Sequence, residues 1–324
     1  MKETKTGLVF LVLLSILLLG HFNAPWAVAE KYPSKPITWI VPMSPGGGFD
    51  VYSRGISQVM EKYIGQPVVI KNMPGAGNRT GTNAIYRARP DGHTIGIINV
   101  AGMAASQLLM KTRFDLEKFT WLGGCAVEKY VMAANAKSPY GTIADLQKVK
   151  TPINVGTTGK GATAYTVVII GLKSFGVPFR LVSGYGGSSE AIVGCIRGDV
   201  DVVAYATTSI LPHVKSGDLR AIVTFTKKRD ELYPDTPTVT ELNKTELAAL
   251  GVPRLVAGPP KIPTGRIKVL VKALEKTLKD PELIAWSKKA KRPIEPISAE
   301  ESKQLQVEIM QTYTGYSKVL KDYF

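Results

Sequence analysis

The sequence contains few of the side chains that bind metals or perform redox chemistry. Three His and two Cys occur among its 324 residues. Outside the N-terminal segment only His93 and His213 remain, and no His or Cys pair has the spacing of metal ligands. His93 belongs to an Asp-Gly-His turn and His213 follows a proline near a helix start, so we interpret both as structural. We therefore expect neither a metal site nor a bound cofactor.

The two cysteines leave two alternatives open. In an oxidising compartment Cys125 and Cys195 could pair. Each also stands among small and apolar residues, where a buried free thiol is common. Whether they pair depends on their distance in space, which a sequence does not give.

The sequence also lacks complete enzyme motifs. No Gly-x-Ser-x-Gly nucleophile motif is present. The run 75–81 resembles a dinucleotide fingerprint but has one residue too many before its last glycine. The run 156–161 resembles a phosphate loop, but Asn154 replaces its first glycine and Gly161 replaces the Ser or Thr after the lysine. We therefore predict no catalytic residues and no enzymatic activity.

Acidic residues are fewer than basic ones. The chain has 41 Lys and Arg against 26 Asp and Glu, a formal net charge of +15. A positive field favours anionic partners and speeds their approach. The basic residues are scattered, apart from a cluster at 288–292 that ends a predicted helix, where cations complement the helix dipole. We therefore predict small anions, not nucleic acid, as partners.

Long apolar runs are absent beyond the N-terminus, and the run there is short. Lys2 and Lys5 precede the apolar residues 8–19, fewer than the ~20 needed to span a bilayer. Small residues at the −3 and −1 positions of a cleavage site follow at 27–29. This pattern is typical of a secretory signal peptide, which we assign to 1–29, with an N-terminal membrane anchor as the alternative. The signal peptide predicts that the mature protein is exported.

Strand-like and helical segments alternate through the rest of the chain. The predicted strands are 37–41, 67–70, 94–100, 131–134, 153–155, 179–182 and 199–205. The predicted helices are one after the N-cap Asp50, one ending near Arg89, a short one capped by Thr142, 163–175, 189–197, and three near 264–279, 281–291 and 298–321. Such alternation indicates an α/β fold, with a mostly parallel sheet covered on both faces.

Four glycine-rich loops each precede a predicted helix, at 44–48, 74–77, 156–161 and 184–188. In a parallel sheet such loops lie at the carboxyl ends of strands, where ligands bind. The helix start behind each loop offers unpaired N–H groups, and glycine lets an oxyanion approach them closely. One such loop could be a plain turn, but four in two parts of the chain favour an anion-binding cleft.

These loops are part of a series of motifs that resembles a known family. The motifs are 42–50 followed by Arg54, 72–77, 90–94, 184–188, 197–201, 211–217 and 234–238. Their order resembles that of receptors for tripartite tricarboxylate transporters, also called the Bug family, over nearly all of residues 32–320.

The resemblance implies a fold, a location and partners. It implies a periplasmic location and a type II periplasmic-binding-protein-like fold of two α/β lobes, each with a mostly parallel sheet, joined by a hinge around a cleft. We place lobe 1 at 30–127 plus 252–324 and lobe 2 at 128–251, with crossing segments near 125–130 and 250–258. The implied partners are a small carboxylate ligand and membrane transporter subunits, and we expect a monomer. A periplasmic enzyme acting on a small acid, or a ligand-sensing partner of a membrane kinase, are the alternatives.

The family's ligand loops correspond to 43–50, 157–163 and 184–188. The candidate ligand-binding residues are Met43, Ser44, Gly46, Gly47, Gly48, Phe49, Asp50, Thr157, Thr158, Gly159, Gly161, Thr163, Tyr185, Gly187 and Ser188. Phe49 stands where the family usually has Thr or Ser, and Ala162 and Tyr165 stand where Ser and His are frequent. Phe49 and Tyr165 could favour an aromatic or larger apolar acid, or could simply pack beside the cleft.

Overall fold

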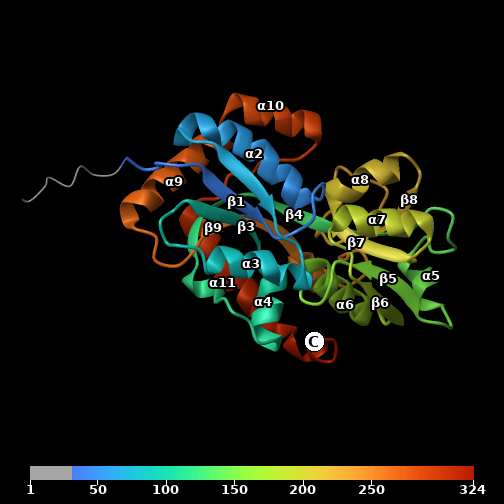
Figure 1. Cartoon of the computed structure of the whole chain (residues 1–324). Helices are drawn as coiled ribbons and strands as arrows, with labels where there is room; N and C mark the ends of the chain where they lie inside the picture. Colours follow the sequence, from blue (N-terminus) through green and yellow to red (C-terminus); the bar gives the residue numbers. More distant parts are fainter. Residues whose placement is uncertain (1–30) are drawn as a thin grey trace, which may run out of the picture. The chain divides into compact units, whose positions relative to one another are not determined.

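A computed structural model describes residues 31–324 (Figure 1). The predicted signal peptide, 1–29, lies outside the described residues. Every element named below belongs to one compact unit, Lys35–Phe324. In the described part of the chain, no helix is both long and apolar enough to cross a membrane.

Nine strands form one hydrogen-bonded sheet within the described residues. They are β1 (Ile37–Val41), β2 (Val68–Asn72), β3 (Thr94–Asn99), β4 (Thr120–Asn135), β5 (Ile153–Thr157), β6 (Phe179–Ser183), β7 (Val202–Ala206), β8 (Leu219–Thr224) and β9 (Gly251–Gly258). Their order is β2-β1-β3-β9-β4-β7-β5-β6, and β8 pairs with β4 off this path.

Helices connect and cover these strands. They are α2 (Gly48–Ile64), α3 (Arg79–Tyr86), α4 (Val100–Leu109), α5 (Ile143–Gln147), α6 (Thr163–Phe175), α7 (Ser188–Arg197), α8 (Thr207–Lys215), α9 (Thr264–Leu278), α10 (Pro281–Ala290), α11 (Ala299–Gly315) and α12 (Ser317–Lys321). Short 3₁₀ turns lie at η1 (Ala76–Asn78), η2 (Leu116–Lys118) and η3 (Thr245–Ala249).

Strand β4 joins two sets of strands. Its residues 120–129 pair with β9, and its residues 130–135 pair with β7 and β8. We call β2, β1, β3 and β9, with their helices, the first half, and β5, β6, β7 and β8, with theirs, the second half. Figure 1 shows these strands on either side of β4.

The sheet is mixed because of its two crossing strands. Each half contains a parallel trio, β2-β1-β3 or β7-β5-β6, as the alternation predicted. Every pairing of β4 or β9 is antiparallel. The sequence predicted only 131–134 of β4 and treated 250–258 as a connection. Glycine and proline weaken strand signals, and Gly123, Gly124 and Pro253 lie here, next to register shifts in the β4–β9 pairing.

Buried side chains of β1 and α2 contribute to the core of the first half. Ile37, Trp39 and Val41, which share one face of β1, are fully buried, and Ile40 on the other face is buried too, because α2 and α3 pack against this strand. Helix α2 buries Tyr52 and Ile56 at helical spacing, and it ends at Gly65, whose φ is 72°. Fully burying such a side chain contributes about 1.5–3 kcal/mol. These elements hold the loop at 44–48 in a fixed place.

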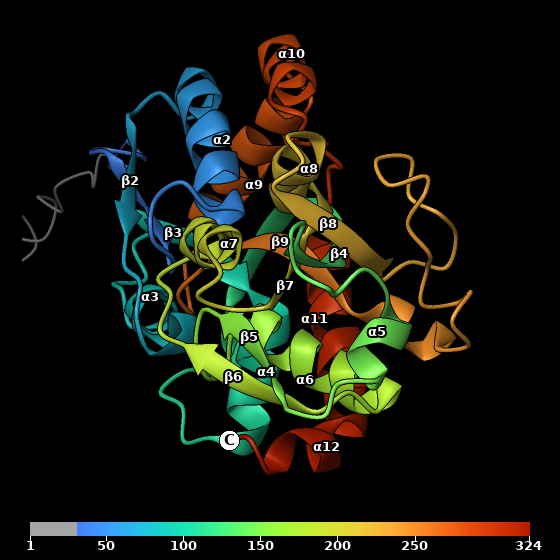
Figure 2. The ribbon, with the colours of Figure 1, turned by 90° about the vertical axis from the view of Figure 1, so that its right-hand side faces the viewer.

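The C-terminal helices pack mainly on the first half, and the last residues reach the second. Helices α9 and α10 contact α2, and α11 contacts α4 and β4. Helix α12 also contacts α6, as Figure 2 shows. The Tyr165 hydroxyl donates to the Tyr323 carbonyl at 2.6 Å, and the Tyr323 ring stacks on Phe179. This differs from the prediction that all of 252–324 supports lobe 1, because these contacts between distant residues leave no trace in sequence periodicity.

Candidate functional site

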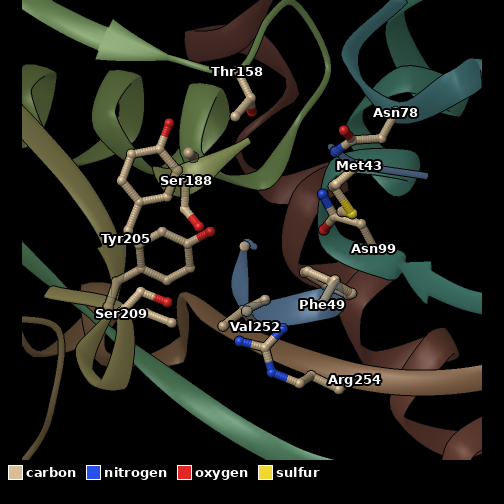
Figure 3. A pocket seen from close by; sticks show the side chains of 15 residues that line it. Met43, Phe49, Asn78, Asn99, Thr158, Ser188, Tyr205, Ser209, Val252 and Arg254 are labelled. Carbon is tan, nitrogen blue, oxygen red and sulfur yellow. The ribbon is translucent and has the colours of Figure 1, made fainter. Parts of the chain in front are cut away.

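A cavity lies where the carboxyl ends of strands from both halves meet. Residues that end or follow all six strands of the parallel trios line it (Figure 3). The space that can hold the centre of a water-sized molecule is about 50 Å³. The lining residues are Met43, Gly47, Gly48, Phe49, Asn78, Asn99, Tyr130, Thr158, Ala164, Ser188, Tyr205, Ala206, Ser209, Val252 and Arg254.

Six helices begin at this cavity. The first turns or N-caps of α2, α3, α4, α6, α7 and α8 contribute lining residues. Among the described residues, no N-cap side chain of these six helices accepts from the first turn, although in α4 the Thr163 side chain accepts from the Gly102 N–H. Side-chain caps occur instead on α5, α10 and α11, away from the cavity. The cavity therefore collects unpaired backbone donors and the positive ends of helix dipoles, which suits an anion.

Asp50 shapes the loop before α2. The sequence predicted it as the N-cap of this helix, and that prediction was wrong. Gly47 occupies the N-cap, with extended backbone. The Asp50 carboxylate, in the first turn, accepts hydrogen bonds from the Gly46 N–H and Arg54 Nε at 2.9 Å and from Asn72 Nδ2 at 2.8 Å. The prediction missed this because Gly46, at φ 84°, turns its N–H back toward the helix.

The charge of Asp50 is stabilised where it stands. Burial alone would raise its pKa, but the hydrogen bonds from Arg54, Gly46 and Asn72 outweigh burial and lower the pKa. Asp50 is buried and does not line the cavity. Its part is to hold the 44–48 loop in position.

The structure brings some predicted site residues together and sets others behind them. Those lining the cavity are Met43, Gly47, Gly48, Phe49, Thr158 and Ser188. A second, open cavity outside it shares Asn78 and Thr158 with the first and is also lined by Gly159 and Tyr185. The predicted residues that line neither are Ser44, Gly46, Asp50, Thr157, Gly161, Thr163 and Gly187. They shape the loops: Thr163, for example, hydrogen-bonds Asn99 and the Gly102 N–H.

Loops of the two halves touch each other around the cavity. The Ser44 N–H donates to the Gly186 carbonyl at 3.1 Å, and Ser189 Oγ donates to the Gly46 carbonyl at 2.9 Å. On the other side, Arg79 Nη1 donates to the Lys160 carbonyl at 2.8 Å. The halves are therefore in contact across the mouth of the cavity.

The two aromatic residues singled out in the sequence have different surroundings. The Phe49 ring lines the cavity. Tyr165 does not; its hydroxyl is bonded to Tyr323, and its ring packs edge-on against Phe324. Tyr165 therefore packs, the second of its two predicted alternatives, whereas Phe49 lines the cavity together with Tyr130 and Tyr205.

Sequence reasoning missed nine lining residues. They are Asn78, Asn99, Tyr130, Ala164, Tyr205, Ala206, Ser209, Val252 and Arg254. Asn99 and Ala206 directly end strands, which is a signal that could have found them. Arg254 is the single charge in the apolar run of β9, and that contrast was its only signal.

Tyr205 offers a further donor from the second half. Its buried hydroxyl lies close to the Thr158 side chain, which also lines the cavity. Burial raises its pKa, so the hydroxyl keeps its proton and can donate to a ligand.

The cysteines do not pair. Cys125 and Cys195 are both buried free thiols, and burial raises the pKa of each to about 12. Residues 31–324 contain no cluster of His, Cys, Asp or Glu that could hold a metal ion.

The chain matches the family model described as "Tripartite tricarboxylate transporter family receptor" over residues 52–321. The protein belongs to this receptor family. Its relative BugT of Bordetella pertussis is 30% identical over 241 residues, covering 71% of this chain and 70% of BugT. The resemblance seen in the sequence motifs is therefore confirmed.

Solved structures of periplasmic binding proteins share the fold of this receptor. The periplasmic binding protein BugD has a TM-score of 0.80 at 24% identity, and the match covers 90% of this chain and 98% of BugD. MatC from Rhodopseudomonas palustris, with bound malate, has a TM-score of 0.79 at 23% identity, covering 89% of this chain and 100% of MatC. The predicted periplasmic-binding-protein-like α/β fold is confirmed.

Proposed function

We propose that this protein is a periplasmic receptor that captures a small organic carboxylate and delivers it to the membrane subunits of a tripartite tricarboxylate-type transporter. The observation that carries the proposal is the meeting of six helix N-termini, none with a hydrogen bond to its N-cap side chain, at one cavity. The excess of basic residues favours the approach of an anion. Bound malate in MatC, a protein of the same fold, supports a carboxylate ligand.

Capture uses the loops of both halves. One carboxylate of the ligand accepts from the free backbone N–H groups at the start of α2, which begins at Gly48. Thr158 and Ser188 cover it from the second half. The two halves act as lobes that close about β4 near 125–130 and about 250–258, a common hinge mode. The contacts from Ser44 to Gly186 and from Arg79 to Lys160 would hold the closed form.

The receptor works as a monomer without catalysis. The cavity lining holds no Asp, Glu, His or Cys in the described part of the chain, so a bound acid meets no carboxylate or imidazole that could act as a general base. The alternatives, an enzyme or a kinase-linked sensor, lack such a supporting observation.

A panel of small acids tests the proposal. Malate, succinate, adipate, citrate and benzoate, each with its amide analogue, would be titrated while the melting temperature and the heat of binding are followed. We expect at least one acid to bind saturably and its amide not to bind. If no acid bound, or if an acid were chemically converted, the receptor proposal would be wrong.

Substitution of Gly47 tests the place of the ligand. A Cβ at Gly47 would lie 3.2 Å from Ser188 Oγ, so a leucine there would fill the space between the halves. Gly47→Leu should abolish binding without unfolding the protein. Gly265→Leu is the matched control, because nothing lies within 4 Å of a Cβ at Gly265. Equal affinities of the two variants would remove this loop from the site.

A further inference from the structure

A buried guanidinium forms part of the cavity wall. Arg254 lies on β9 and is 1% exposed. Its guanidinium carbon lies 4.6 Å from the ring centroid of Phe49 and 4.6 Å from that of Tyr52, both on α2. Figure 3 shows the guanidinium at the cavity beside Val252 and Phe49. Packing by the two rings holds it in one orientation.

Arg254 is only partly satisfied by its ion-pair partner. Glu128 of β4 accepts a hydrogen bond from its Nε and forms an ion pair with its Nη2. The other Glu128 oxygen accepts from the Thr208 hydroxyl. Arg254 Nη1 is buried and has no hydrogen-bond partner among the described residues. A buried donor without a partner costs free energy, so this N–H calls for an acceptor in the cavity.

The charges around Arg254 do not cancel. Arg292 approaches the same cluster through Thr208 and Ser209, so two guanidinium groups stand near one carboxylate, Glu128. Burial by itself would lower the pKa of Arg254, but the charge of Glu128 outweighs it and the pKa is raised. The guanidinium therefore keeps its charge, and the cluster holds a positive excess that a ligand anion could neutralise.

The guanidinium also lies beside the start of α2. A Cβ at Gly48 would be 2.6 Å from Arg254 Nη2, so this glycine allows the guanidinium to approach the first turn. Backbone donors of the helix and the free Nη1 of Arg254 therefore converge on one part of the cavity. A planar carboxylate has two oxygens, one for each set of donors.

We propose that Arg254 binds the ligand directly, its Nη1 donating to a carboxylate that the start of α2 also holds. This inference rests on the proposed receptor function and adds to it a charged side chain as ligand contact and specificity determinant. It predicts that the site prefers planar carboxylates to amides because an amide replaces one acceptor oxygen by a donor that faces the guanidinium.

The test compares two variants that differ only at position 254. Removing Arg254 alone would leave the negative charge of Glu128 buried without its ion-pair partner. The reference is therefore Glu128→Gln and the test variant is Glu128→Gln/Arg254→Gln. Calorimetric titration would use whichever acid of the panel binds the native protein most tightly. We expect the double variant to bind at least about tenfold more weakly than the reference, equivalent to about 1.4 kcal/mol.

Two further variants separate direct contact from other effects. Arg292→Gln removes a neighbouring positive charge that does not line the cavity, and its affinity should fall by less than about threefold. If Arg292→Gln lost as much affinity as the double variant, the effect would be one of overall positive charge near the cavity, and a direct contact with Arg254 would be rejected. If the double variant does not fold, Arg254→Lys replaces it, and unchanged affinity there would overturn the proposal.

The outcomes distinguish this inference from the receptor function. Binding of an acid with equal affinity by Glu128→Gln and Glu128→Gln/Arg254→Gln would reject Arg254 as a ligand contact and leave the receptor function standing. Failure of the native protein to bind any acid of the panel would reject both.

Discussion

Alanine at Gly77 should prevent closure of the two halves without preventing folding. Gly77 lies in η1 of the first half with φ 62°, and its backbone packs on the 159–160 loop of the second half. A Cβ there would overlap the Lys160 carbonyl oxygen and lie 2.8 Å from the carbonyl carbon, against 3.4–4 Å for ordinary contact. The clash involves backbone on both sides, so the loops themselves must separate.

The size of the effect follows from two terms. Alanine at positive φ costs about 1–2 kcal/mol in every folded state and should lower the melting temperature. The clash acts only when the halves touch, so it destabilises the closed, ligand-bound form alone. Overpacking of this kind costs about 1–3 kcal/mol, and a cost in the middle of that range would weaken ligand binding about 30-fold. Gly65→Ala is the matched control, since Gly65 has φ 72° and nothing within 4 Å of its Cβ.

Titration calorimetry and solution scattering would measure the two terms. Gly77→Ala and Gly65→Ala should lose similar amounts of thermal stability, whereas only Gly77→Ala should lose affinity and the ligand-induced decrease in radius of gyration. If both variants bound as tightly as each other, closure through the Gly77–Lys160 contact would be refuted.

Two further predictions concern ionisable groups. Hydrogen bonds lower the pKa of Asp50 below 3.8, so its contribution to the free energy of unfolding should be complete above about pH 4 and be lost as the pH falls below 3.8. In urea unfolding, Asp50→Asn should therefore lose less stability on acidification than the native protein. An equal loss in both proteins would contradict this assignment. Because burial raises the pKa of Cys125 and Cys195 to about 12, neither thiol should react with a disulfide reagent at about pH 8 until the protein unfolds. Rapid labelling of the native protein would contradict the burial of both thiols. The same pKa shifts should make the free energy of unfolding fall as the pH rises from 9.0 toward about 12, since the unfolded chain releases these protons first.

Local signals predicted the regular elements well where one segment carried the whole pattern. Helix α6 has the predicted bounds, because a glycine loop precedes it and Gly176, at φ 68°, ends it. Helices α9 and α10 begin and end within two residues of their predicted limits. Capping and glycine stops act over a few residues, so the sequence displays them directly.

Signals failed where distant partners determine the structure. Strands β4 and β9 are interrupted by glycine and proline and are held by their pairing with each other, so their strand character depends on residues far away in the chain. Asp50 was misplaced by a similar effect, because Asn72, 22 residues later, is one of its three partners.

The sequence by itself determined that this chain has glycine loops leading into helices, an excess of positive charge and the motifs of a transporter receptor, since each of these is written in neighbouring residues or in composition. Tertiary structure alone decided which helix starts meet at one cavity, and that Tyr205 and Arg254, the latter with an unpaired donor, lie buried against it. The physical reason is that strand order and burial are set by pairings across the whole sheet, and no short stretch of sequence records them.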